Sequence, residues 1–219
     1  IVNDNFNIEI SETQTLDLFD NISPKTNHTY DVGSWWLERY FSNQIYQNQY
    51  NAHTPANIDN LQIKNKVYTN VLKIKDTYLK NFESKRLQLG IDENTLGVQI
   101  RGTDKKQELP EINIQTIFDL IDRFGKEKIF IATDDKHYLD CLLNKYGERI
   151  VYDKSLQISS NSQSLHHNCF DRSRINEEVL SSVYLLSKCN YFLYSFSNVS
   201  LLALIMGINN FKFIDYLNK

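Results

Sequence analysis

An arginine stands at the end of an alternating apolar run near the middle of the chain. The run at 96–100 changes between apolar and other side chains with a period of two, which predicts a strand over 96–101. Arg101 would then lie at the carboxyl end of that strand, where open α/β sheets bind ligands. A guanidinium there can hold a phosphate through two parallel charge-assisted hydrogen bonds, with Gly102 giving the backbone a conformation that other residues resist. The alternative is a surface ion pair between Arg101 and Asp104.

Three more polar clusters follow apolar runs in the same way. They lie at 133–135 (Thr-Asp-Asp), at 166–168 (His-His-Asn) and at 195–198 (Ser-Phe-Ser-Asn). Because the carboxyl ends of parallel strands share one edge of a sheet, we expect all four clusters to meet at that edge.

Two of these clusters also have simpler interpretations. Asp134 or Asp135 would N-cap a helix that begins near Lys136, and two adjacent carboxylates are only a weak signal for a divalent cation. His166 and His167, with Cys169 close by, lack a second pair of ligands, so a loop is a better interpretation than a zinc site.

Ser197 is placed to cap the final helix of the chain. The N–H groups and the positive dipole end of that helix would then face the site, which suits a phosphate. The first strand is not followed by G-x-G-x-x-G, and neither a P-loop nor a G-x-S-x-G motif is present. The remaining interpretation is a nucleoside diphosphate held by Arg101 and the Ser197 helix.

Strands and helices alternate after Gly90. The expected strands are 96–101, 128–132, 149–152, 191–194 and 211–214. The expected helices carry apolar stripes at 114–121, 139–146, 177–188 (after an N-cap at Asn176) and 199–206 (closed by Gly207), and a polar loop covers 153–175. This alternation predicts an α/β fold, a Rossmann-like parallel sheet flanked by helices with right-handed crossovers.

The N-terminal part has a different character. Residues 1–33 predict irregular structure, and 34–41 predict a short amphipathic helix whose tryptophans are core side chains rather than a sugar platform. A single helix is expected from 58 to 89, with Gly90 as its stop. We therefore divide the chain into a partly irregular and helical region at 1–92 and a Rossmann-like domain at 93–219.

Composition excludes several classes of protein. The 219 residues carry a net charge of −3, which gives no basic field for nucleic acid, and no run is long enough to span a membrane. Three cysteines are too few and too scattered for a disulfide framework, and Cys141 and Cys189 are expected in the core. Sequons at Asn21, Asn27 and Asn198 matter only in a secretory compartment, and the sequence leaves open whether a soluble chain of this kind is cytoplasmic or in the lumen of the secretory pathway.

The polar clusters together resemble the fucosyltransferase superfamily. The resemblance is carried by 99–105 (QIRGTDK), 132–135 (ATDD), 185–189 (LLSKC) and 195–200 (SFSNVS), in that order. It implies the donor-binding half of a type B glycosyltransferase, an inverting enzyme that moves fucose from GDP-fucose to a hydroxyl of a glycan or protein acceptor. It also implies that no metal or other cofactor is needed, and that Asp134 and Asp135 position the Arg101 loop or cap their helix.

The resemblance assigns roles to individual residues. It places Gln99, Arg101, Gly102, Asp104, Lys105, Asp134, Asp135, Ser195, Ser197, Asn198 and Ser200 at the donor. Arg101 would neutralise the charge that develops on the departing GDP, and Glu108 is the nearest carboxylate that could act as the base.

The sequence also departs from the family pattern. The family has His-x-Arg-Arg where this chain has Gln99, Arg101 and Gly102, and it often has a guanine-binding aspartate where this chain has Ser182. These departures leave two alternatives open, a non-catalytic nucleotide- or glycan-binding module of the same fold and a transferase that uses another nucleotide sugar.

Overall fold

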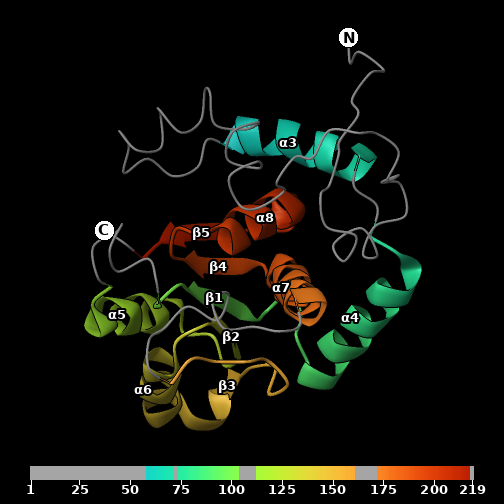
Figure 1. The fold of residues 1–219 in the computed structure, drawn as a ribbon. Helices are drawn as coiled ribbons and strands as arrows, with labels where there is room; N and C mark the ends of the chain where they lie inside the picture. Colours follow the sequence, from blue (N-terminus) through green and yellow to red (C-terminus); the bar gives the residue numbers. More distant parts are fainter. Residues whose placement is uncertain (1–57, 72–73, 104–111, 161–171, 218–219) are drawn as a thin grey trace.

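The computed structural model describes residues 58–71, 74–103, 112–160 and 172–217 (Figure 1). Its helices are α3 (Ile58–Val71), α4 (Asp76–Leu89), α5 (Ile114–Phe124), α6 (Lys136–Tyr146), α7 (Arg172–Ser187) and α8 (Asn198–Gly207), with a 3-10 turn η2 (Gly147–Arg149). Its strands are β1 (Leu96–Ile100), β2 (Ile129–Thr133), β3 (Ile150–Val151), β4 (Tyr191–Tyr194) and β5 (Phe213–Tyr216).

The strands form one parallel sheet in the order β3-β2-β1-β4-β5. The chain therefore moves outward from β1 to β3 and then crosses back to β4 on the other side of β1. Such a reversal opens a crevice at the carboxyl ends of the two central strands, here β1 and β4. The predicted α/β class and Rossmann-like parallel sheet are confirmed.

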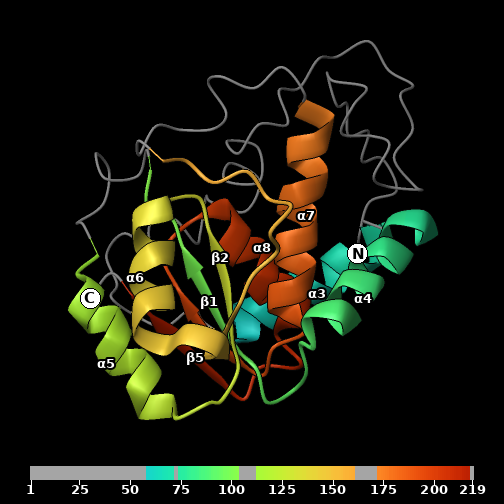
Figure 2. The ribbon, with the colours of Figure 1, turned by 90° about the horizontal axis from the view of Figure 1, so that it is seen from below.

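Helices cover both faces of the sheet (Figures 1 and 2). α5 and α6 pack on one face around Ile117 and Leu142, whereas α7 and α8 pack on the other around Leu185 and Leu204. All five residues of β1 are buried, as expected for a strand with helices on both sides. α3 and α4 lie outside α8 and α7 respectively, and the predicted boundary at 92/93 stays a prediction.

Local signals predict most element limits to within one or two residues. β1, β2, β4, α5 and α8 agree with the expectation, and Gly90 ends α4 in the left-handed conformation (φ 63°). No helix in the described ranges is long and apolar enough to cross a membrane.

The single helix predicted over 58–89 is wrong, because α3 and α4 are separate helices. Lys75, between them, is extended (φ −57°, ψ 141°). On α3, the Asn65 side-chain amide donates to the Ile205 carbonyl of α8 at 2.7 Å, whereas Phe82 of α4 is buried among residues that include those of α7. Because α3 packs on α8 and α4 packs on α7, the chain bends between them, and the continuous apolar stripe does not predict this bend.

The third crossover also differs from the prediction. Gly147–Arg149 form a 3-10 turn, so β3 contains only Ile150 and Val151. The Arg149 guanidinium donates a hydrogen bond to the Lys126 carbonyl. α7 begins at Arg172, which places the expected N-cap Asn176 inside the helix and shortens the predicted 153–175 loop. Arg174 and Glu178 lie one helical turn apart, and their ion pair, from Arg174 Nε to Glu178 Oε1 at 2.8 Å, stabilises the added turn of α7.

The last strand starts two residues later than predicted. The Gly207 carbonyl accepts N–H groups from Asn210 and Phe211, which holds this stretch in a turn. The Phe211 ring stacks on Phe192 with centroids 5.2 Å apart, so it fills the core from the turn and not from β5.

Candidate functional site

The adjacent carboxyl ends of β1 and β4 bring the first and fourth polar clusters together. The Arg101 N–H donates to Ser195 Oγ at 2.7 Å, and the Ser195 hydroxyl donates to Gln99 Oε1 at 3.1 Å. The Ser195 N–H also donates to the Gln99 carbonyl at 2.9 Å, so both side chains are fixed at the sheet edge. Gln99 is 3% exposed and Ser195 1%, so these hydrogen bonds are shielded from water.

Asp134 joins the second cluster to the first. Its Oδ2 lies 2.7 Å from Arg101 Nη1 and accepts from the Thr103 hydroxyl at 2.7 Å, while its Oδ1 accepts the Gly102 N–H at 2.8 Å. The carboxylate therefore holds three consecutive residues of the turn after β1. Asp104, the partner expected for a surface ion pair, lies outside the described residues, and the ion pair of Arg101 is with Asp134.

Gly102 is required here for space and not for backbone conformation. The glycines with positive φ in the described ranges are Gly90, Gly125 and Gly147, so the expectation of an unusual conformation at Gly102 is wrong. A Cβ at Gly102 would instead stand 2.5 Å from the Asp135 Cβ and 2.9 Å from Tyr138 Cδ2. Close packing of the turn on the start of α6 excludes any side chain.

Asp135 has the structural role considered above. It is 1% exposed and its Oδ1 accepts the His137 N–H at 2.9 Å, which makes it the N-cap of α6. The two adjacent carboxylates thus serve different parts of the chain. Among the described residues, no three His, Cys, Asp or Glu side chains are arranged to hold a metal.

The start of α8 follows β4 at the same edge of the sheet. Ser197 and Ser200 form a reciprocal capping box, in which Ser197 Oγ accepts the Ser200 N–H at 3.1 Å and Ser200 Oγ accepts the Ser197 N–H at 3.0 Å. The N–H groups of Asn198 and Val199 lead the helix, and its dipole favours an anion in front of them. The predicted cap is confirmed, whereas contact of any of these residues with a donor stays a prediction.

Several predicted residues lie outside the described ranges. These are Asp104, Lys105 and Glu108, the pair His166 and His167 with Asn168 and Cys169, and the N-terminal tryptophans and first two sequons. Cys189 is buried as predicted, and burial raises the pKa of its thiol, whereas Cys141 is only partly buried. Ser182 donates to the Glu178 carbonyl of its own helix at 3.0 Å.

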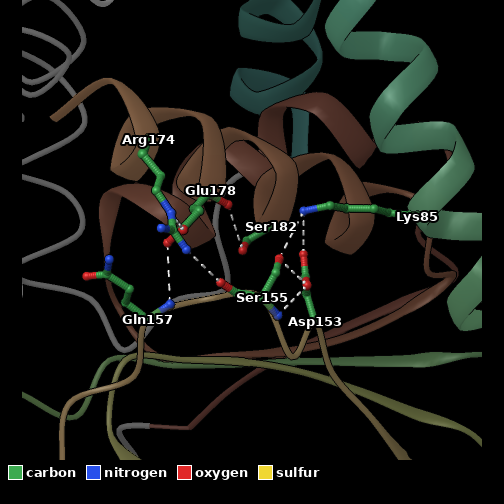
Figure 3. Close-up of polar contacts among 7 residues, drawn as sticks. All are labelled: Lys85, Asp153, Ser155, Gln157, Arg174, Glu178 and Ser182. Carbon is green, nitrogen blue, oxygen red and sulfur yellow. Dashed lines mark hydrogen bonds and ion pairs between the residues drawn. The ribbon is translucent and has the colours of Figure 1, made fainter. Parts of the chain in front are cut away.

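The structure also contains a polar network that no motif in the sequence signals (Figure 3). It joins α4, the segment after β3 and α7 through Lys85, Asp153, Ser155, Gln157, Arg174 and Glu178. Isolated charged residues on helices predict a solvated surface, and only the packing of three distant segments turns them into a network.

No family model and no curated protein sequence matches the chain. Among solved structures, it is similar to the α-1,6-fucosyltransferase NodZ from Bradyrhizobium co-crystallised with GDP, with 14% identity, a TM-score of 0.44 and coverage of 64% of this chain and 44% of NodZ. It is also similar to POFUT1 in complex with GDP-fucose, with 10% identity, a TM-score of 0.43 and coverage of 76% and 51%.

The chain therefore spans less than half the length of NodZ and about half that of POFUT1. Its fold class rests on its own strand order and not on these similarities.

Proposed function

We propose that the chain binds the diphosphate of a nucleotide sugar at the β1/β4 crevice and is a glycosyltransferase of the fucosyltransferase type. One observation carries the proposal: two motifs that resemble that superfamily, separated by 94 residues between Arg101 and Ser195, meet through one 2.7 Å hydrogen bond. They meet at the carboxyl ends of the two strands where the strand order reverses, the usual ligand position in such sheets.

The roles of Arg101, Asp134 and α8 in this proposal rest on the geometry above, and that of Glu108 rests on the sequence alone. Loss of GDP from GDP-fucose would leave negative charge on the β-phosphate, which Arg101 and the leading N–H groups of α8 would stabilise without a metal. The acceptor hydroxyl would attack the anomeric carbon from the opposite side with inversion, giving its proton to Glu108. Asp134 would position Arg101 by holding the turn in which it lies.

Calorimetry with GDP and GDP-fucose tests the proposal. Arg101→Ala should weaken GDP binding by about 1.5–3 kcal/mol, or roughly 10- to 150-fold. Arg101→Lys should restore only part of this, because lysine lacks the planar fork. Lys106→Ala, a neighbour without an assigned role, should change little.

Two results would overturn the assignment. One is that neither nucleotide binds at millimolar concentration, and the other is that Arg101→Ala binds GDP as well as the parent while its circular dichroism is unchanged. GDP binding that EDTA abolishes and manganese restores would contradict the metal-independent part alone.

A non-catalytic binding module is the second candidate. It is favoured by the ion pair itself, since the Arg101 guanidinium already contacts Asp134 at 2.7 Å. GDP binding with neither donor hydrolysis nor transfer to a panel of glycan and peptide acceptors would support this candidate. Competition by UDP- and other GDP-linked sugars tests the choice of donor, because Ser182 replaces the aspartate of the family pattern.

A further inference from the structure

The segment after β3 leaves the sheet and then returns to it. We name residues 152–160 the strap. In the β2–β3 ladder Ile150 pairs with Ile129, 21 residues earlier, whereas at the isolated bridge Ser159 pairs with Asp135, 24 residues earlier. The segment from Ile150 to Ser159 therefore contains three residues more than the segment from Ile129 to Asp135 that it faces. Regular ladder hydrogen bonds therefore do not fix its course, and other contacts must do so.

The first anchor of the strap is an ion pair with α4. Lys85 Nζ lies 2.6 Å from Asp153 Oδ2, and Asp153 Oδ1 accepts both the N–H and the hydroxyl of Ser155, at 2.9 and 2.6 Å (Figure 3). The Asp153 side chain is 9% exposed, so its charge depends on these donors. The turn at the start of the strap is thereby tied to a helix that precedes the sheet in sequence.

The second anchor comes from α7. Glu178, held by Arg174, accepts the Gln157 N–H at 3.4 Å, and Arg174 Nη2 reaches the Ser155 carbonyl at 3.5 Å (Figure 3). Both contacts are long, so this anchor is weaker than the ion pair with Lys85.

The third anchor connects the strap to the candidate site. The Ser159 N–H donates to the Asp134 carbonyl and the Ser159 carbonyl accepts the Lys136 N–H, each at 2.9 Å. The strap therefore fixes the backbone of Asp134, whose carboxylate holds the turn of Arg101 and Gly102.

We propose that the strap couples α4 to the turn after β1, and that Lys85 is a remote positioning residue for Arg101. Docking of Asp153 on Lys85 fixes the strap, the strap fixes Asp134 through Ser159, and Asp134 presets the Arg101 turn. The coupling itself needs no ligand, and only its consequence for nucleotide binding rests on the proposed function.

Hydrogen exchange at the Gly102 amide tests the coupling directly, because that N–H donates to Asp134 Oδ1. In Lys85→Met, which keeps the stem and removes the charge, the Gly102 amide should exchange at least about tenfold faster relative to the core amide of Phe130. Lys85→Arg preserves the ion pair and should stay within about threefold of the parent.

Lys145→Met controls for the loss of a paired lysine charge elsewhere in the fold. Lys145 also pairs with a carboxylate at 2.7 Å, that of Asp122, and its side chain has the same 33% exposure as that of Lys85, but it links α5 to α6 away from the strap. This variant should leave exchange at Gly102 unchanged relative to Phe130.

Equal acceleration at Gly102 and Phe130 in Lys85→Met would mean that Lys85 only stabilises the fold, and would overturn the proposal. An unchanged Gly102 amide would overturn it as well. If the parent binds GDP, Lys85→Met should weaken that binding by about three- to tenfold. If the parent does not bind GDP, the proposed function fails while the exchange measurement still decides the coupling.

Discussion

The two edges of the sheet are built from opposite chemistry, although the same strands make both. At the amino edge, β4 and β5 begin with the paired residues Tyr191 and Phe213, which lie against Phe124 with ring centroids 6.1 and 4.6 Å away. Lys126 Nζ stands 3.8 Å over the Tyr191 ring. At the carboxyl edge, β4 is followed by the buried hydroxyl of Ser195.

The two edges differ in how strictly their contacts depend on geometry. Aromatic contacts at the amino edge are broad and individually weak, so one ring can be lost without displacing its neighbours. Contacts at the carboxyl edge are hydrogen bonds with fixed geometry, three of them to the Asp134 carboxylate, so each loss leaves an unpaired partner. Changes at the carboxyl edge should therefore affect both stability and binding, and changes at the amino edge stability alone.

Asp134→Ala should have the largest effect. It removes the contacts to Arg101, Gly102 and Thr103 together, which should cost about 1.5–3 kcal/mol of unfolding free energy and weaken GDP binding at least tenfold. Urea denaturation and calorimetry measure the two effects. Asp134→Asn, which keeps one acceptor oxygen and loses the charge, should fall between Asp134→Ala and the parent. Parent-like GDP binding by Asp134→Ala would break the proposed distinction between the edges.

Gly102→Ala should come next, at about 1–3 kcal/mol, because its Cβ would overlap Asp135 and Tyr138. Gly125→Ala is the control variant, because Gly125 follows the C-terminal end of α5. Gly125 has φ 57° and no atom within 4 Å of an added Cβ, so that variant should lose stability through the backbone alone, by about 1 kcal/mol. Gly102→Ala should weaken GDP binding and Gly125→Ala should not. Equal binding by the two variants would contradict the steric role of Gly102.

Acid should lower the free energy of unfolding, in part through protonation of Asp153. Burial alone would raise the pKa of Asp153, but the hydrogen bonds from Lys85 and Ser155 outweigh it and hold that pKa below the usual value. A carboxyl whose pKa is lowered by folding stabilises the fold above its unfolded pKa of about 3.9, and this contribution is lost as pH falls through the lower folded pKa. Denaturation at pH 7 and pH 3 should therefore show a smaller loss of stability for Asp153→Asn than for the parent. A larger loss in the variant would mean that another group controls the acid response.

Phe213→Ala should have the smallest effect. The side chain is 39% exposed, and its ring contact with Phe124 at 4.6 Å contributes about 0.5–1.5 kcal/mol. Thermal unfolding should show a slight decrease in Tm while GDP binding stays at the parent value. Loss of nucleotide binding in a folded Phe213→Ala variant would show that the edges are coupled.

The parts of the site that depend on residues close together in the chain can be predicted from the sequence. Ser197 caps α8 through Ser200, three residues away, and Asp135 caps α6 through His137, two residues away. Such caps, like the apolar periods of the helices, depend on interactions within one turn. The position of the described clusters at 101–103, 133–135 and 195–198 at one edge then follows from the alternation of strands and helices.

The sequence by itself thus determined the parallel α/β class, most element limits and the edge at which the polar residues gather. Only the tertiary structure decided that β4 lies beside β1, so that Ser195 meets Arg101, and that Asp134 is an ion-pair partner of Arg101. It also decided the break between α3 and α4 and the course of the strap. The physical reason is distance along the chain: Lys85 and Asp153 are 68 residues apart, and no local propensity encodes a contact that forms only when separate elements pack.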